Sequence, residues 1–415
     1  MSSCDVNGLM PLSDALERMQ QSLSNVCETI TLPISDALGS ILSSDLVSTQ
    51  QVPSFNNSAM DGYAVLAEDL KTCSDETPVD LTLIGSSFAG SPFTGAVEAG
   101  CCLRIMTGAV IPEPFNCVVM QEQCSVKDNV VTFTKQARRN DNVRFAGEDL
   151  AIGQLVLQQG HKLTARDIPL LASLGIITVE VYRPLTVAVF SSGDELKELD
   201  QHLADGDVYD SNRYSIIALL SRLNIKVIDL GIIKDDYLLI KEAMLTADQQ
   251  ADVVISSGGV SVGDADFIKA VLNEIGEINF WKLAIKPGKP FAFGRLPNSV
   301  FFGLPGNPVS AIVTLYQLAI PAMAKMSGEV YKSALRFNAI CNNKLKKRPG
   351  RTDFQRGIYS INEQGQVVVN TTGTQSSGVL SSMSHSNCFI VLEQDRGNVQ
   401  AGEIVTVEPY SYLMN

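Results

Sequence analysis

Residues 184–328 alternate between continuous apolar runs of strand length and longer amphipathic segments. The apolar runs lie at 185–190, 225–230, 252–256 and 298–303, and the helix-like segments between them lie at 212–223, 237–247 and 266–275. Strands that are apolar on both faces are typical of a parallel sheet with helices on both sides. This region therefore predicts a doubly wound, mostly parallel α/β domain.

The flanking regions have a different texture. Short alternating runs separated by Gly and Pro predict an all-β insert, and similar runs after about residue 330 predict a small β-barrel-like domain. Helix-start signals at 11–14 and 33–36, and an apolar segment at 164–175, predict helices in the N-terminal part. We expect a multidomain α/β and β protein. Its parts are a discontinuous helical linker domain (1–52 and 148–180), an inserted β domain (53–147), the α/β domain (181–330) and a C-terminal β domain (331–415).

Composition narrows the class of partner. The chain has 415 residues, 45% of them hydrophobic and 19% charged, and a net charge of −13. This balance is that of a globular protein, and the negative charge argues against a nucleic acid or an anionic membrane as partner. An anion can still bind where a local cationic pocket or a metal ion supplies positive charge. The apolar run at 309–323 contains Gln317 and Pro321, which favours a buried helix over a membrane span.

The cysteines and histidines argue against a disulfide framework or zinc site and against a histidine-dependent catalytic triad. The N-terminus has no secretory signal, and the nine cysteines include no C-x-x-C pair, so free thiols in a reducing cytoplasm are expected. His161, His202 and His385 lie far apart in polar or glycine-rich surroundings. A histidine-dependent catalytic triad is therefore not expected.

Three glycine-rich turns follow predicted strands of the α/β domain, at 191–195, 256–266 and 303–308. Ligands of doubly wound sheets bind outside the carboxyl ends of the strands, and glycine amides can cradle phosphate oxygens there. One such turn alone has a structural explanation, but three at equivalent positions favour a phosphate-bearing ligand. Asn307 and Pro308 form a good helix start that directs amides to the same edge. The expected binding residues are Ser257, Gly258, Gly259, Pro305, Gly306, Asn307 and Pro308.

Carboxylates accompany these turns at 194–195, 235–236, 264 and 266. Acidic side chains beside a phosphate cradle are chemically reasonable if a divalent cation bridges them, and Mg²⁺ takes one or two carboxylates together with phosphate and water. We therefore predict Glu195, Asp235 and Asp266 as metal ligands. The alternative is that Asp235 and Asp266 cap the helices that follow them.

The segment 281–290 carries Lys282, Lys286 and Lys289 beside a Pro-Gly turn. Strand periodicity would place Lys282 and Lys286 on one face, where two ammonium groups could bind one anion. The alternative is a solvated sheet edge. A second basic run, at 344–356, is expected to be a solvated strand face. Asp61 in a glycine turn and Thr107 at a strand end are, on these residues alone, more simply structural.

Together these segments resemble the molybdopterin molybdenumtransferases, bacterial relatives of the E domain of gephyrin. The resemblance runs over nearly the whole chain. The matching motifs are Ser58-Ala-Met-Asp-Gly-Tyr-Ala, Arg104-Ile-Met-Thr-Gly-Ala, Gly147-Glu-Asp, Ser192-Gly-Asp-Glu-Leu, Tyr209-Asp-Ser-Asn-Arg, Ser256-Ser-Gly-Gly-Val-Ser-Val-Gly-Asp-Ala-Asp, Lys286-Pro-Gly-Lys-Pro and Leu304-Pro-Gly-Asn-Pro.

The resemblance implies a function and an assembly. It implies a homodimer of four-domain subunits, with the active site between the α/β domain of one subunit and the β insert of the other. It implies that adenylylated molybdopterin reacts with molybdate in the presence of Mg²⁺, giving molybdenum cofactor and AMP. An adenylyltransferase and molybdoenzyme-delivery proteins are the implied partners. The implied functional positions are Asp61, Thr107, Asp149, Glu195, Asp235, Asp266, Lys282, Lys286, Pro305 and Pro308, of which Asp149 rests on the resemblance alone.

Two departures and three alternatives accompany this interpretation. The family often has Asp at Asn56 and an Arg-rich run where this chain has Arg144-Phe145-Ala146, which weakens an anion-binding role for that stretch. The α/β region alone also resembles molybdopterin adenylyltransferase. A gephyrin-like scaffold without catalysis and a nucleotide-processing hydrolase are the other candidates.

Overall fold

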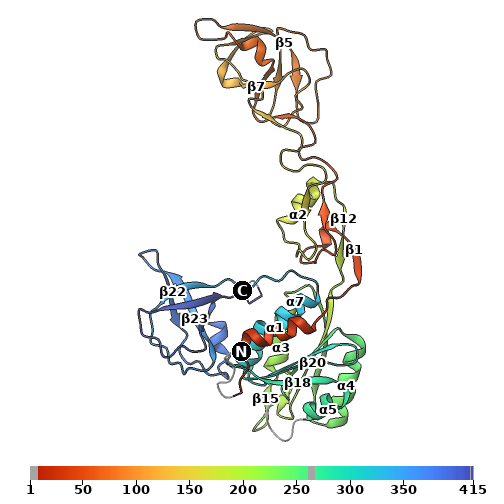
Figure 1. Ribbon diagram of the computed structural model, residues 1–415, viewed down its shortest axis with the longest axis vertical. Coiled ribbons are helices and arrows are strands. Elements are labelled where there is room, and N and C mark those ends of the chain that lie inside the picture. The colour runs from red at the N-terminus through yellow and green to blue at the C-terminus, as the bar shows by residue number, and fades with distance from the viewer. Residues whose placement is uncertain (1–7, 260–266, 412, 415) are drawn as a thin grey trace.

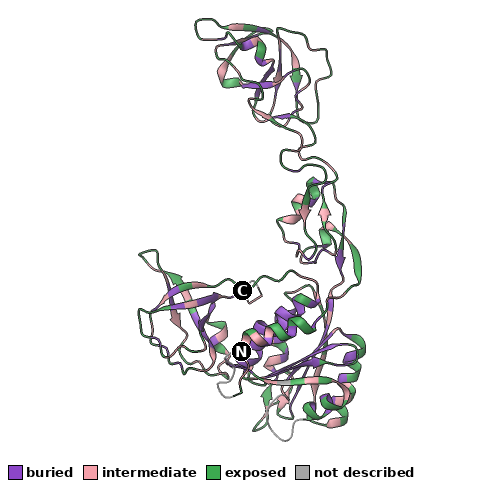
Figure 2. Ribbon diagram, in the orientation of Figure 1, coloured by how far each residue is buried: buried purple, intermediate pink, exposed green. Residues whose placement is uncertain are grey.

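The computed structural model describes residues 8–259, 267–411 and 413–414. The molecule is elongated: the α/β sheet and the C-terminal sheet share one end, the inserted β sheet lies at the other, and a narrow linker connects them (Figure 1). Buried residues gather mainly between the α/β sheet and its helices and inside the two β regions (Figure 2). Residues in the insert and residues on the α/β sheet therefore lie far apart within one chain.

A six-stranded sheet forms the centre of the α/β region, in the order β16-β13-β17-β21-β20-β18. The first four strands are parallel, β20 is antiparallel to β21, and β18 is antiparallel to β20, so that β20 alone runs in the opposite direction. The doubly wound, mostly parallel sheet is thus confirmed. The strands span Leu185–Ser192 (β13), Ile225–Ile233 (β16), Val253–Ser257 (β17), Glu277–Lys282 (β18), Pro290–Arg295 (β20) and Val300–Leu304 (β21).

Helices cover both faces of this sheet, as its apolar strands predict. One face packs against α1, α3 and the run α6–η4–α7, and the other packs against α4 and α5. The run Pro308–Met326 is long and apolar enough to cross a membrane, but 94% of its most apolar window is buried inside the protein, as for a core helix. The bounds are Leu12–Ser22 (α1), Ser211–Leu220 (α3), Tyr237–Gln250 (α4), Phe267–Ile275 (α5), Pro308–Thr314 (α6), Leu315–Ala319 (η4, a π-turn) and Ile320–Met326 (α7).

The linker contains less helix than its sequence signals predict. The predicted helix beginning at Pro33 was wrong: residues 29–33 form a strand, only a 3₁₀ turn follows, and Gly39 adopts a positive φ of 80°. The alternating Thr-Ile-Thr-Leu run pairs with residues 178–182 instead, because β-branched residues suit an extended backbone. The linker elements are Thr29–Pro33 (β1), Ile34–Asp36 (η1), Leu46–Val47 (β2), Leu155–Leu157 (β11), Asp167–Ser173 (α2) and Thr178–Tyr182 (β12).

The insert is an all-β domain built on one sheet with the order β7-β4-β6-β5-β9-β8. The chain enters and leaves it through a short antiparallel pair, β3 with β10. Apolar side chains fill both sides of the sheet. The elements are Asn57–Ser58 (β3), Gly62–Val65 (β4), Ala67–Leu70 (η2), Val79–Ser87 (β5), Cys101–Ile105 (β6), Cys117–Met120 (β7), Gln121–Gln123 (η3), Cys124–Lys127 (β8), Val130–Phe133 (β9) and Val143–Arg144 (β10).

The C-terminal region is the small barrel that its sequence predicts. The sheet runs β19-β23-β24-β22-β26-β25, and an additional pairing of β23 with β25 closes it. β19 belongs to the connection after β18, so this pairing joins the barrel to the α/β region. The elements are Ile285–Lys286 (β19), Phe337–Cys341 (β22), Thr352–Ile361 (β23), Val367–Thr371 (β24), Ser381–Ser384 (α8), Cys388–Leu392 (β25) and Ile404–Pro409 (β26); two short strands, Leu196–Lys197 (β14) and Val208–Tyr209 (β15), complete the α/β region.

An ion pair fixes the linker to the α/β sheet. Arg183 lies between β12 and β13, and its two terminal nitrogens each lie 2.7 Å from a carboxylate oxygen of Asp252, which precedes β17. The Thr186 amide donates to the same carboxylate over 2.8 Å. Burial opposes ionisation of Asp252, but the hydrogen bonds from Arg183 and Thr186 outweigh it and hold the pKa of this carboxyl below its ordinary value.

Replacing Asp252 by Ala leaves the Arg183 guanidinium without its two-point partner. We expect the free energy of unfolding to fall by about 2 kcal/mol, less than for a fully buried pair because both groups keep some solvent contact. Denaturant unfolding at pH 7 measures this loss. Glu28→Ala removes the more exposed partner of the same guanidinium and should cost no more than about 0.5 kcal/mol, so equal losses in the two variants would contradict the assignment.

The same pair makes stability depend on pH. Because the folded pKa of Asp252 lies below its unfolded value, the carboxylate stabilises fully above about pH 5 and loses this effect as the pH falls through the folded pKa. The stability difference between the unmodified chain and Asp252→Ala should therefore shrink between about pH 5 and pH 2. A difference that stays constant over this range would show that the carboxylate does not act through its charge.

Candidate active site

The topology of the α/β sheet defines a switch point beside β13. The chain passes from β13 to β16 on one side of it and then crosses to β17 on the other side. The carboxyl ends of adjacent parallel strands diverge at such a point, and ligands of doubly wound sheets bind there. The turns after β13, β17 and β21 all lie at this edge, because these strands are parallel and adjacent.

The turns at this edge are in direct contact. The Gly258 amide donates to the Leu304 carbonyl over 3.1 Å. A Cβ added to Gly258 would lie 2.6 Å from the Ser192 carbonyl oxygen, and one added to Gly306 would lie 3.9 Å from the Gly258 Cα. Gly258 also has a positive φ of 90°. Gly258 therefore lies between the two neighbouring turns, and its contact with Ser192 and its positive φ both require glycine at this position.

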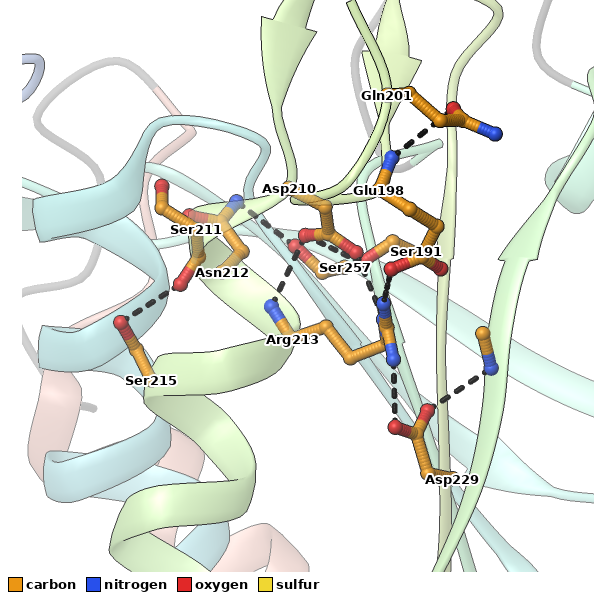
Figure 3. Close-up of polar contacts among 11 residues, drawn as sticks. Ser191, Glu198, Gln201, Asp210, Ser211, Asn212, Arg213, Ser215, Asp229 and Ser257 are labelled. Carbon is orange, nitrogen blue, oxygen red and sulfur yellow. Dashed lines mark hydrogen bonds and ion pairs between the residues drawn. The ribbon is translucent and has the colours of Figure 1, made fainter.

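The first turn of α3 ties these turns together. The Asn212 side-chain nitrogen donates to the Ser257 hydroxyl over 2.8 Å and to the Gly306 carbonyl over 2.7 Å. Asn212 points toward Ser257 from the start of the helix (Figure 3). This one amide bridges the turns after β17 and β21, a role that the sequence analysis did not assign. The signal was present in Tyr209-Asp-Ser-Asn-Arg, where an Asp cap precedes a polar first turn.

Arg213 anchors the same helix start and is nearly buried. Its guanidinium pairs with Asp210 over 3.0 Å, Asp229 over 2.5 Å and Glu198 over 2.5 Å (Figure 3). Asp210 also accepts hydrogen bonds from the Arg213 amide and the Ser191 hydroxyl, each over 3.1 Å. Burial opposes the charge of Arg213, but Asp229 and Asp210 outweigh it and raise the pKa of the guanidinium. Glu198 lies in the segment after Glu195, so this network also restrains the acidic turn.

Asp194 and Glu195 lie close enough to Asp235 to disfavour its ionisation. Burial, Asp194 and Glu195 together raise the pKa of Asp235, and the Asp235 amide donates to the Asp194 carboxylate over 3.2 Å. The cap of α4 is Asp236, which accepts from the Leu238 and Leu239 amides, so the capping alternative for Asp235 was wrong. Like charges held together in this way fit a site that a cation neutralises.

Part of the predicted metal set cannot be placed. Asp266 lies outside the described residues, as does Asp264. Within the described ranges, no group of three Asp, Glu, His or Cys side chains is arranged to hold a metal ion. Glu195 and Asp235 are thus neighbours at the edge, and the third ligand stays a prediction.

The helix start after β21 offers fewer amides than its sequence suggests. Asn307 is the N-cap and Pro308 is in the first turn, as expected, but the Asn307 side chain forms no capping hydrogen bond. The Val309 amide donates to the Ser377 carbonyl over 3.1 Å. The Val309 amide is therefore not available to a ligand. The part of this turn that faces the neighbouring turns is Gly306.

The lysines of segment 281–290 do not share a strand. Lys282 ends β18 and is exposed, whereas Lys286 belongs to β19 and pairs with Asp353 of the barrel over 3.1 Å. The premise of one continuous strand was wrong, because buried residues 283–285 carry the chain from one sheet to the other. Lys286 lines a basic hollow between the α/β region and the barrel, whose further lining includes Lys346, Lys347, Arg348 and Arg351.

The basic run at 344–356 is not a uniformly solvated face, and that prediction was wrong. Lys347 is buried, and its ammonium group donates to the carbonyls of residues 348, 394 and 396. Burial lowers the pKa of Lys347. Arg356 is fully buried, with hydrogen bonds to the Ser382 hydroxyl and the Ser376 carbonyl. The alternation of polar and apolar residues in this segment did not indicate that the Lys347 and Arg356 side chains are buried.

Asp61 and Thr107 form a separate pair in the insert. The amide and the hydroxyl of Thr107 donate to one oxygen of Asp61 over 2.8 and 2.9 Å. The Thr107 amide, followed by its hydroxyl, lowers the pKa of the Asp61 carboxyl. Both residues are exposed, and Asp149 is exposed where the chain returns to the linker. The insert and the sheet edge lie at opposite ends of the chain (Figure 1), so one chain does not bring these groups to Glu195.

The fold and this edge define a multidomain protein with a candidate ligand site at the switch point of an α/β sheet. Comparison with known families divides the chain in the same way. Residues 10–175 match the MoeA N-terminal region (domain I and II), residues 188–325 match a probable molybdopterin binding domain, and residues 338–410 match the MoeA C-terminal region (domain IV).

Individual relatives agree over nearly the full length. Molybdopterin molybdenumtransferase of Haemophilus influenzae is 50% identical over 98% of this chain and 100% of that protein. The Nostoc protein of the same name is 34% identical over 89% of this chain and 86% of its own length. The crystal structure of the molybdopterin biosynthesis MoeA protein from Pyrococcus horikoshii OT3 covers 97% of this chain and 100% of its own, with a TM-score of 0.85 and 27% identity. The chain belongs to the molybdopterin molybdenumtransferase family, transferases of molybdenum cofactor biosynthesis.

The repulsion among the acids predicts a gain in stability when one is neutralised. Without divalent cations, Asp235→Asn should raise the melting temperature by about 1 °C, because it removes a charge that Asp194 and Glu195 disfavour. Added Mg²⁺ should stabilise the unmodified chain more than this variant. Asp236→Asn is the matched control and should change little, since Asn caps helices as well as Asp does. A lower melting temperature for Asp235→Asn would contradict the proposed repulsion.

Proposed function

We propose that this transferase inserts molybdate into adenylylated molybdopterin in a Mg²⁺-dependent reaction that releases AMP. The observation that carries the proposal is the combination, at one sheet edge, of contacting glycine turns with a cluster of acids in which burial, Asp194 and Glu195 raise the pKa of Asp235. Glycine turns suit a phosphate-bearing ligand, and carboxylates suit a cation that accompanies it. The family likeness supports molybdopterin as the substrate class.

The donor set fits Mg²⁺ in its chemistry. Glu195 and Asp235, with Asp266 as the predicted third ligand, would hold the ion through carboxylate oxygens, the ligands that Mg²⁺ prefers. The ion would neutralise negative charge on the phosphoanhydride. Around it, Ser257, Gly258, Gly259, Pro305, Gly306, Asn307 and Pro308 form the ligand-binding turns. The structure supports contact among these turns.

Molybdate is an oxyanion, and the proposed route for it is cationic. Lys286 lines the basic hollow beside the barrel, and Lys282 is exposed at the end of β18. Ammonium groups attract an oxyanion as point charges. The overall charge of −13 would otherwise repel molybdate. Lys282 and Lys286 are thus proposed to draw molybdate toward the dithiolene of the bound pterin.

The decisive assay is AMP release from purified adenylylated molybdopterin, with and without molybdate and Mg²⁺. We expect release to require both. Release without molybdate would indicate a nucleotide-processing hydrolase instead. Consumption of ATP with unadenylylated pterin would indicate an adenylyltransferase, and binding without any turnover would indicate a scaffold.

Glu195→Ala tests the acidic turn directly. The variant should still bind the adenylylated pterin through the glycine turns, but it should release AMP at least about 100-fold more slowly, because charge on the phosphoanhydride is no longer neutralised. Single-turnover AMP release and substrate binding, measured on the same preparation, separate the two effects. Glu198 offers no clean control, because its partner Arg213 belongs to the network at this edge. Glu28→Ala is the control: its partner Arg183 lies at the linker, away from the glycine turns, and the pair is exposed on the Glu28 side. Full AMP release by Glu195→Ala would remove Glu195 from the chemistry.

We also propose that a second copy of the chain completes the site. The insert that carries Asp61 and Thr107 lies at the far end of the molecule from the α/β sheet, and Asp149 lies where the chain returns from the insert to the linker, so these groups and Glu195 would act on one substrate if the insert of one subunit meets the sheet edge of another. A homodimer places both ends together twice by symmetry.

Mixed dimers test this arrangement. Asp61→Ala and Glu195→Ala should each be nearly inactive alone, but co-expression should restore about a quarter of the normal activity, because half of the dimers then carry one intact site. Co-expression of Lys286→Ala with Glu195→Ala is the control. These residues belong to the same end of one chain, so no intact site forms. Absence of restoration in the first pair, with dimers present, would contradict a shared site.

A further inference from the structure

Three buried polar atoms at the sheet edge have no hydrogen-bond partner among the described residues. They are the Ser192 hydroxyl at the end of β13, the Ser256 hydroxyl near the end of β17, and the side-chain oxygen of Asn212 at the start of α3. Ser192 and Ser256 are 6% and 0% exposed. Leaving a buried polar atom unpaired costs free energy, and such groups in native proteins usually serve a bound ligand or water.

The orientation of the Asn212 amide is determined by its neighbours. The Gly306 carbonyl can only accept, so the Asn212 atom 2.7 Å away from it must be the nitrogen. The same nitrogen donates its second hydrogen to the Ser257 hydroxyl. Both donor hydrogens of Asn212 are therefore used, and its oxygen is left as an acceptor.

The surroundings hold that acceptor in place. Arg213, the next residue, is fixed by its three carboxylate partners, and Asp210 caps the helix start (Figure 3). A side chain on such a rigid first turn keeps its direction without a ligand, which is the arrangement that favours binding.

The unused acceptor limits which part of a ligand can lie beside it. Ionised phosphate oxygens only accept hydrogen bonds, so phosphate cannot satisfy the Asn212 oxygen. We propose that Asn212 binds an N–H or O–H donor of the substrate, and that it also positions the turns after β17 and β21. The shared chemistry is a hydrogen-bond donor next to the phosphates. It comes either from the nucleotide, as a ribose hydroxyl or the adenine amine, or from the pterin, as its amine or ring N–H.

This assignment rests on the proposed function, because it takes adenylylated molybdopterin as the ligand. It adds that Gly258 and Gly259 contact the phosphates of the ligand, while Asn212 forms a hydrogen bond with the neighbouring chemical group. Substrates that share the phosphates but lack the donor would be discriminated against, since a site built around a hydrogen bond leaves its own polar group unpaired when the donor is missing.

Binding measurements on the full chain, without turnover, test the assignment. Isothermal titration gives the Kd of AMP, of its 2′-deoxy and 3′-deoxy forms, of the analogue without the adenine amine, and of molybdopterin. The unmodified chain is compared with Asn212→Ala. Ser215→Ala is the matched control: it removes a hydroxyl from the same helix that bonds only the Ser211 carbonyl, over 2.8 Å. Melting temperatures verify that each variant is folded.

Two results would support the proposal. If the donor belongs to the nucleotide, deleting one group of AMP weakens binding about tenfold in the unmodified chain and not in Asn212→Ala. If it belongs to the pterin, Asn212→Ala weakens molybdopterin binding about tenfold more than it weakens AMP binding, because both ligands lose the positioning of the turns but only the pterin loses the hydrogen bond. In both cases Ser215→Ala behaves like the unmodified chain.

Two other results would overturn it. If Asn212→Ala weakens the binding of all ligands equally, the only role left for Asn212 is to position the turns. If it weakens the binding of none, water and not a ligand satisfies the Asn212 oxygen. Failure of the unmodified chain to bind either AMP or molybdopterin would instead count against the proposed function, and the assignment of Asn212 would fall with it.

Discussion

The close contact of the turns after β13, β17 and β21 is the constraint on which the rest of the site depends. Gly258 lies so close to the Ser192 carbonyl on one side that a Cβ would not fit, and it is in van der Waals contact with Gly306 on the other side. Because the turns touch, one amide, that of Asn212, can bridge two of them. Asn212, Ser257 and Gly306 are thereby brought to a single small region, although 45 and 94 positions separate Asn212 from the other two along the chain.

Charge is distributed unevenly around this region, and that distribution reconciles an acidic protein with anionic substrates. The acids that raise the pKa of Asp235 lie at the sheet edge, while Lys286 and the cations of the barrel line a separate hollow. Shared apolar packing joins the barrel to the α/β region, with Phe354 and Phe389 in the same core cluster as the sheet. The two charged regions thus belong to one packed unit, so their separation is maintained by the fold.

The sequence predicted features that depend on local periodicity and failed where tertiary packing decides. Apolar runs indicated the parallel sheet, and glycines after them indicated the turns that contact one another at its edge, because both signals lie within a few residues. The helix predicted from Pro33 failed because a start signal cannot report that Thr29–Pro33 has a strand partner some 150 residues away. Buried Lys347 was missed because its partners are carbonyls from distant loops, which leave no trace in composition. Asn212 was overlooked for a similar reason, since its importance comes from contacts with turns that only folding brings near.

The elongated shape gives the last constraint on how such a site can work. The narrow linker holds Asp61 and Thr107 far from Glu195, yet Thr107 already holds the Asp61 carboxylate in a fixed orientation and an ionised state. A carboxylate that is ionised, oriented and exposed can bind a group that belongs to another domain or another molecule. The Arg183–Asp252 pair fixes the direction in which the linker leaves the α/β sheet, so the insert is presented at a defined distance from it. An extended arm of this kind suits the proposed delivery of residues to a neighbouring subunit better than closure onto its own sheet edge, because the insert and that edge lie at opposite ends of one chain.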